Sequence, residues 1–222
     1  MDIRLWMKYI MKLDEVNHIL DANNIQYIKI QNGIQEKHVS DEDYYELKNY
    51  GETGYIYYHV QEKNNKEFEI LQSDIEEVNK VFLLIILSKA ELEYSREKRN
   101  ELFIKIADIE TIADLRYQIE KYNITTDYLI GENKNITINI IIKETGYLLC
   151  INKNSLTVYS EKIDTFVKAK NRLIFFLLKN DFLTLVMEKG KYEGYILKMD
   201  QEDYKHFFKP IRKIERKSYI LK

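Results

Sequence analysis

The sequence predicts an α+β fold built as a tandem repeat of two similar units, each a small, mainly antiparallel sheet with packed helices. An apolar run at Val81–Leu87 returns 92 residues later as Leu173–Leu178. At the same offset Glu52-Thr53-Gly54-Tyr55 recurs as Glu144-Thr145-Gly146-Tyr147. Short connections between the expected strands favour antiparallel pairing, because parallel strands need long crossovers. The repeats predict two domains, one over residues 1–108 with the N-terminal helix and one over 109–222 with the C-terminal helix.

The first repeat is expected to alternate strands with amphipathic or apolar helices. Apolar side chains three and four residues apart indicate the opening helix, Asn32-Gly33 is a turn signal, and Ser73 and Asp74 resemble a helix N-cap. In chain order we expect a helix over 3–22, a strand over 25–30, a long connection over 31–42, two strands between 44 and 60, a strand over 67–71, the apolar helix to about residue 88, and strands over 91–95 and 101–107.

The second repeat is expected to run through the same series. Asp108 and Asp200 are expected to cap the helices that follow them. Gly54 and Gly146 are expected to serve backbone geometry or close packing. In chain order we expect a helix over 109–122, strands over 128–130, 136–143, 146–152 and 156–159, a helix over 162–179, strands over 182–187 and 195–199, and a final helix after residue 200.

Composition points to a globular, cytoplasmic protein. The chain is 45% hydrophobic and 32% charged, which is typical of a folded domain. Cys150 is the only cysteine, which excludes an intrachain disulfide and a cysteine-based metal site. The N-terminus lacks the pattern of a signal peptide, and the apolar runs are too short to span a bilayer. The abundance of Ile, Lys and Asn is typical of a bacterium or phage with AT-rich DNA.

The two halves of the chain carry opposite charge. Residues 1–110 contain 14 Lys+Arg and 22 Asp+Glu, a balance of -8, and residues 111–222 contain 20 and 14, a balance of +6. Opposite charges help two repeats to dock, or each half faces a different partner. Both interpretations stay open.

No residue pattern calls for a particular chemistry. The four histidines, at positions 18, 38, 59 and 206, are scattered without metal-ligand spacing. There is no glycine-rich phosphate loop and no Gly-x-Ser-x-Gly nucleophile elbow. We therefore assign no catalytic, cofactor-binding or metal-binding residue and expect a protein that is not an enzyme.

The leading hypothesis is a protein-binding or inhibitory protein. The chain has 18 tyrosines, which are favoured at interfaces, and its acidic half suits a basic partner. The candidate partner-binding residues combine negative charge with aromatic side chains and are Asp41, Glu42, Asp43, Tyr44, Tyr45 and Glu46. The alternatives are nucleic-acid binding through the basic C-terminal half, with Lys209, Arg212 and Lys213 as candidates, and an enzyme of unrecognised type.

Part of each repeat resembles the small α+β immunity proteins of bacterial polymorphic toxin systems. The residues that carry the resemblance are Gly54-Tyr55-Ile56-Tyr57-Tyr58 and the helix that follows Ser73. The second repeat departs from it, with Leu149-Cys150 in place of Tyr57-Tyr58. The resemblance implies a non-enzymatic inhibitor that binds one toxin domain, and a phage protein that blocks a bacterial defence factor would share these features.

Overall fold

The computed structural model describes residues 11–37, 42–60, 66–122, 124, 126–131, 133–135 and 137–208. In these residues the fold is α+β, as predicted, with two separate sheets. The chain forms two compact units, Met1–Ile86 with Lys189–Lys198 and Leu87–Glu188 with Met199–Lys222. The long helices α2 (Ile75–Tyr94) and α5 (Phe166–Glu193) each contribute to both units. The predicted boundary between residues 108 and 109 follows the sequence repeat and stays a prediction.

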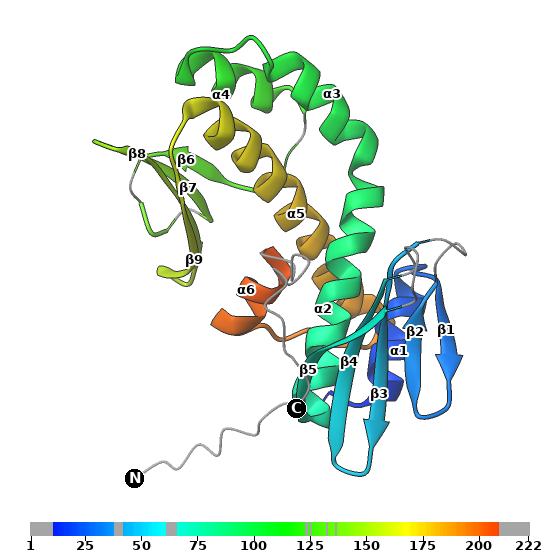
Figure 1. Ribbon diagram of the computed structural model, residues 1–222. Coiled ribbons are helices and arrows are strands. Elements are labelled where there is room, and N and C mark those ends of the chain that lie inside the picture. The colour runs from blue at the N-terminus through cyan, green and yellow to red at the C-terminus, as the bar shows by residue number, and fades with distance from the viewer. Residues whose placement is uncertain are drawn as a thin grey trace. The chain divides into compact units, whose positions relative to one another are not determined.

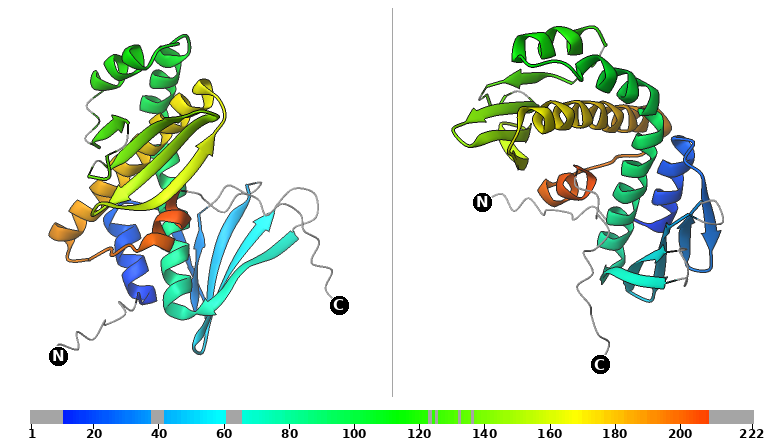
Figure 2. Two further views of the ribbon diagram at one scale, coloured as in Figure 1. Left: turned by 90° about the vertical axis from the view of Figure 1, so that its left-hand side faces the viewer. Right: turned by 45° about the horizontal axis from the view of Figure 1, so that its top comes forward.

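The first unit contains a five-stranded antiparallel sheet whose strands are neighbours in chain order. Helix α1 (Leu13–Ala22) and the first half of α2 lie on the same face of this sheet (Figure 1, Figure 2). The strands are β1 (Tyr27–Ile30), β2 (Gly33–Glu36), β3 (Tyr44–Tyr50), β4 (Thr53–Val60) and β5 (Lys66–Asp74). The predicted helix over residues 3–22 is confirmed from Leu13, and residues 3–10 lie outside the described part of the chain.

Strand β2 corrects the long connection predicted over residues 31–42. Asn32 adopts a positive φ of 59°, which makes the tight turn that pairs Ile30 with Gly33. Ile34 then pairs with Leu47, which pairs with Ile56 on β4, and all three side chains are fully buried. Burial of Ile34 on the helix-facing side explains why this short segment is a strand.

The sheet and helix α2 approach each other closely at Gly54. A Cβ atom at this position would lie 2.8 Å from Val78 Cβ of α2, so a glycine is required there, as predicted. Nearby, the fully buried Asn79 donates from Nδ2 to the carbonyl of Met11 and accepts from Asn49 Nδ2. At the start of α2, Asp74 Oδ1 accepts from the backbone N–H of Glu77, which confirms the predicted cap.

The second unit contains a four-stranded sheet of order β6-β7-β8-β9. Strand β6 is parallel to β7, and the other pairs are antiparallel. Helix α5 packs on one face, where Tyr159 meets Phe176 edge-on at 5.5 Å and Tyr147 lies 6.0 Å from Phe166. The remaining elements of this unit are α3 (Arg96–Ile106), α4 (Ile112–Glu120), β6 (Tyr128–Ile130), β7 (Ile138–Lys143), β8 (Gly146–Lys153), β9 (Leu156–Ile163) and α6 (Gln201–Phe208).

Four predicted strands are wrong, because α2, α3 and α5 occupy or border those segments. Residues 91–94 are the last turn of α2, residues 101–106 belong to α3, residues 182–187 lie within α5, and residues 195–199 have no regular structure. The buried side chains at positions 102 and 106, and at 182, 183 and 186, follow the spacing of one helix face. One of the two predicted helix caps is confirmed, because Asp200 accepts hydrogen bonds from two backbone N–H groups of α6. The other is wrong, because Thr111, not Asp108, caps α4.

The apolar runs of the two helices differ in burial. Every side chain from Val81 to Leu87 is at most 3% exposed, so the run in α2 is buried on all sides, as its unbroken apolar sequence predicts. The apolar run in α5 predicts that Phe175 is buried as well, but Phe175 is only half-buried, and the fully buried ring there is that of Phe176. The Phe175 ring lies about 5.1 Å from the cationic groups of both Arg172 and Lys179.

Two buried lysines of α5 organise the polar interior of the second unit. Lys170 Nζ donates to three carbonyls, those of Ile106 at 2.6 Å, Ala107 at 2.7 Å and Ile109 at 2.9 Å, and so caps the C-terminal end of α3. Lys179 Nζ donates to Ser88 Oγ at 2.6 Å. Burial lowers the pKa of Lys179 to about 7, against the opposing pull of the Glu91 carboxylate.

Candidate functional site

The face of the five-stranded sheet that points away from α1 and α2 carries a row of aromatic rings. Strand alternation and the β3–β4 register place Tyr50, Tyr55, Tyr57, His59 and Tyr44 on this side, which we call the open face. Successive ring centroids lie 5.8, 6.1, 6.5 and 4.4 Å apart along that order. The row therefore runs along β3 and β4, from the turn that joins these strands to their opposite ends.

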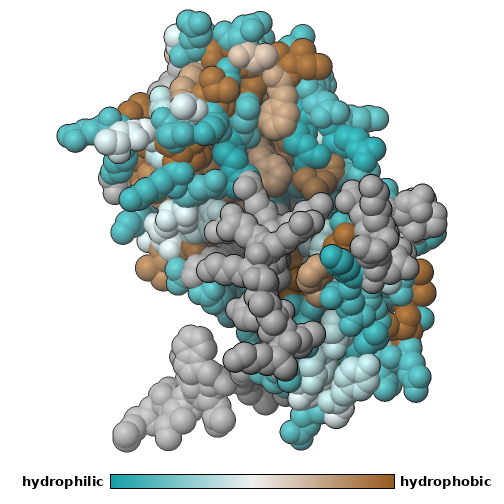
Figure 3. Space-filling view, in the orientation of Figure 1, coloured by the Kyte–Doolittle hydropathy of each residue, from teal (hydrophilic) through white to brown (hydrophobic). Residues whose placement is uncertain are grey.

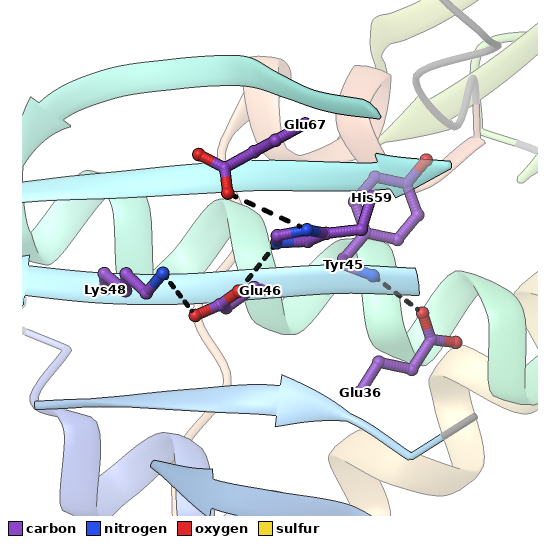
Figure 4. Close-up of polar contacts among 6 residues, drawn as sticks. All are labelled: Glu36, Tyr45, Glu46, Lys48, His59 and Glu67. Atoms are coloured by element: carbon purple, nitrogen blue, oxygen red, sulfur yellow. Dashed lines mark hydrogen bonds and ion pairs between the residues drawn. The ribbon is translucent and has the colours of Figure 1, made fainter. Parts of the chain in front are cut away.

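A compact charged cluster lies within the row. Glu46 Oε1 lies 2.7 Å from Lys48 Nζ, and Glu46 Oε2 lies 2.6 Å from Nε2 of His59. On the other side of the imidazole, Glu67 Oε2 lies 3.8 Å from Nδ1 (Figure 4). The ring of Tyr44 stacks on His59 at an interplanar angle of 9°. Both oxygens of Glu46 are thus engaged inside the protein, and the Glu46 side chain is only 7% exposed.

Strand β5 adds carboxylates along the edge of the row. Its register places Glu69 opposite Tyr57 and Glu67 opposite His59, so both acids stand on the open face. The Glu67 side chain is 50% exposed and Glu69 is also exposed. In the space-filling view the surface over β3 and β4 is teal to white, the colours of polar residues and tyrosine (Figure 3).

Two tyrosines of the row, Tyr44 and Tyr57, lie beside the charged cluster. Burial, followed by the neighbouring glutamates, raises the pKa of Tyr44 and Tyr57 above the ordinary tyrosine value. Their hydroxyls therefore stay protonated at neutral pH. The hydrogen bond to Glu46 raises the pKa of Lys48, which keeps that ammonium charged. The resulting surface combines rings with carboxylates.

The structure brings some of the predicted partner-binding residues together and separates others. Tyr44 and Glu46 belong to the open face, and Glu42 is exposed just before β3. Asp43 accepts a 2.6 Å hydrogen bond from the Tyr58 hydroxyl. Tyr45 faces the helices, is 9% exposed, packs against Tyr58 at a tilt of 40° with ring centroids 4.9 Å apart, and donates its backbone N–H to Glu36. Asp41, like Lys209, Arg212 and Lys213, lies outside the described residues.

Sequence reasoning missed the β4 and β5 members of the face. The signal was present as alternation, with Tyr55, Tyr57 and His59 two residues apart on one predicted strand and Glu67 and Glu69 two apart on the next. Side chains at that spacing share a sheet face. Only the pairing register shows that the two sets are adjacent.

The second unit has a partly polar cavity on the face of its sheet away from α5. A cavity of about 170 Å³ is lined by Asn139, Cys150, Asn152 and Ser160 among others. The thiol of Cys150 is buried, and its cross-strand neighbours are Asn139 and Ser160.

Comparisons with known proteins leave the site to be interpreted from its own geometry. No family model, curated protein or solved structure matches the chain. Among the described residues, no three His, Cys, Asp or Glu side chains are arranged to hold a metal ion. Nor does any helix in that part of the chain have the length and apolar character needed to cross a membrane.

Proposed function

We propose that this chain is a non-enzymatic protein that binds a basic protein partner in the cytoplasm and inhibits it, as an immunity protein or a phage anti-defence protein would. The observation that carries the proposal is the aromatic row of the open face with carboxylates along its border. Tyrosine offers a large contact area at low entropic cost, and peripheral charge of one sign steers an oppositely charged protein toward the surface.

Charge and burial favour a protein partner over a small substrate at this face. The rings lie side by side on a sheet surface, and the buried carboxylate of Glu46 lies within ion-pair distance of Lys48 and His59. An interface of this kind needs a broad surface with aromatic anchors near its centre. The exposed acids Glu42, Glu67 and Glu69 then form a rim that acts chiefly on the association rate.

The experiment begins with the purified chain as bait in a lysate of the source cell, and each captured protein is then purified and tested alone. Association rates are measured by biolayer interferometry between 50 and 400 mM salt. A captured basic protein should associate more slowly as salt rises, and Asp41→Lys with Glu42→Lys should slow it further. Asp43 is left intact because Tyr58 depends on it. An association rate that changes neither with salt nor with the two substitutions would contradict the proposal.

We also propose that the two halves of the chain are tandem repeats of one unit. In each half, three antiparallel strands in chain order precede a long helix, as β3-β4-β5-α2 and as β7-β8-β9-α5. The repeated glycine is tightly packed in both, since a Cβ at Gly146 would lie 2.4 Å from the carbonyl oxygen of Ile163. Superposition of the two halves in an experimental structure, with Gly54 on Gly146 and Phe82 on Ile174, tests this proposal.

A further inference from the structure

We propose that the open face binds an extended, arginine-bearing segment of the partner, laid along β4 with its basic side chains over the tyrosine rings and beside Glu67 and Glu69. The inference rests on the proposed function and specifies the partner's chemistry. Three features of the face carry it: a cation that the chain itself already places there, the spacing of the rings, and the exposed carboxylates of β5.

The chain's own Lys48 shows how the face holds a cation. Its ammonium lies 2.7 Å from Glu46 Oε1 and 5.3 Å from the centroid of the Tyr57 ring. A carboxylate and a ring face thus act together on one positive charge, the combination that stabilises cation–π contacts at protein surfaces. On the neighbouring strand β5, Glu69 pairs with Tyr57 and is exposed. This repeats the pairing of ring and carboxylate at a position that an external cation can reach.

The spacing of the rings matches an extended peptide. Tyr55 and Tyr57 are 6.1 Å apart by centroid, and Tyr57 and His59 are 6.5 Å apart. Alternate side chains of an extended chain recur every 6 to 7 Å or so, because each residue rises about 3.3 Å. A partner segment with basic residues at every second position therefore presents them in step with the rings and with Glu67 and Glu69.

Arginine fits this face better than lysine does. The guanidinium is planar, stacks on aromatic rings and donates two parallel hydrogen bonds to a carboxylate. Glu67 offers a half-exposed carboxylate 3.8 Å from His59 Nδ1, while Glu46 Oε2 lies 2.6 Å from Nε2 of the same imidazole ring. The same acids repel phosphate groups, so the aromatic row does not suit a nucleic acid.

The test uses the full chain and synthetic peptides of eight residues in which arginine alternates with threonine. Binding is followed by two-dimensional ¹⁵N NMR, with a lysine–threonine peptide and an oligothymidylate as comparison probes. We expect saturable shifts in β3, β4 and β5 with the arginine peptide, affinity a few-fold lower for the lysine peptide, and no binding of the oligonucleotide. Glu67→Gln with Glu69→Gln should lower affinity for the arginine peptide about fivefold, and Tyr57→Leu about threefold.

A second double variant separates a specific face from general attraction to an acidic protein. Glu110→Gln with Glu144→Gln makes the same change in net charge at two exposed positions of the second compact unit. It should leave peptide affinity unchanged. Equal losses in the two double variants, shifts confined to other strands, or tighter binding of the oligonucleotide would each overturn the inference. A captured protein that still binds the intact chain would in that case preserve the proposed function.

Discussion

Replacement of Lys170 by methionine tests the interior of the second unit most sharply. The side chain is 2% exposed, and its ammonium directs its three protons at the carbonyls of Ile106, Ala107 and Ile109. Methionine fills a similar volume and keeps the helix propensity of the position. The substitution therefore removes the cap at the end of α3 while changing little else.

The expected loss follows from the burial of the three acceptors. A polar group left buried without a partner costs about 1–3 kcal/mol. The bond to Ile106 is buried, whereas those to Ala107 and Ile109 are partly buried and regain water in the variant. Relief from burying an ammonium offsets part of the loss. We expect the free energy of unfolding to fall by about 2–4 kcal/mol.

Urea denaturation followed by circular dichroism measures this change. Lys168→Met is the matched control, because Lys168 lies on the same helix, is 65% exposed and pairs only at the surface with Asp164. It should cost less than about 0.5 kcal/mol. Lys170→Arg keeps the charge but replaces a three-pronged donor with a planar one, so it should also destabilise. A Lys170→Met loss below about 1 kcal/mol would show that the three carbonyls do not depend on this lysine.

Three further predictions concern stability. The wild type should gain stability relative to Lys179→Met as pH rises from 7 to 9. In this range Lys179 is protonated in the unfolded chain but has lost its proton in the folded protein, where its pKa is lowered to about 7. A stability difference that does not change with pH in urea titrations would refute this. Phe82→Ala should cost about 3–5 kcal/mol and Phe175→Ala clearly less, since only the first ring is fully buried; equal losses would contradict the burial. Gly54→Ala should lower the melting temperature, because a Cβ at Gly54 would lie 2.8 Å from Val78 Cβ of α2; an unchanged melting temperature would be incompatible with this packing.

The sequence predicts the α+β class and most strands, because alternation and turn residues are local signals. Asn32-Gly33 and Tyr50-Gly51 mark real turns. The missed helices have a physical cause. Residues 91–106 are rich in charge, and the two inward side chains of α3, Leu102 and Ile106, are too few to display a helical period. Their helical state depends on tertiary packing, to which the buried Lys170 contributes from 64 residues away.

The candidate site was predictable only in part for a similar reason. Local charge and aromatic content identify the segment that leads into β3, and Tyr44 and Glu46 do lie on the open face. Side chains along β3 alternate between the two faces of the sheet, and packing decides which set faces the helices. Tyr45 belongs to the set that is packed inside. The association of Tyr57 with Glu69 depends on a strand register that is set beyond a bulge after Ile56. No local pattern in the sequence encodes that register.

The measurement that tests the central claim most directly is the affinity of a captured partner, purified and measured by titration calorimetry, for two charge-matched variants of this chain. If the partner binds the open face, Glu67→Gln with Glu69→Gln should weaken binding at least about fivefold, while Glu110→Gln with Glu144→Gln leaves it unchanged. Equal affinities for the two variants would contradict the account and place the binding surface elsewhere on the chain.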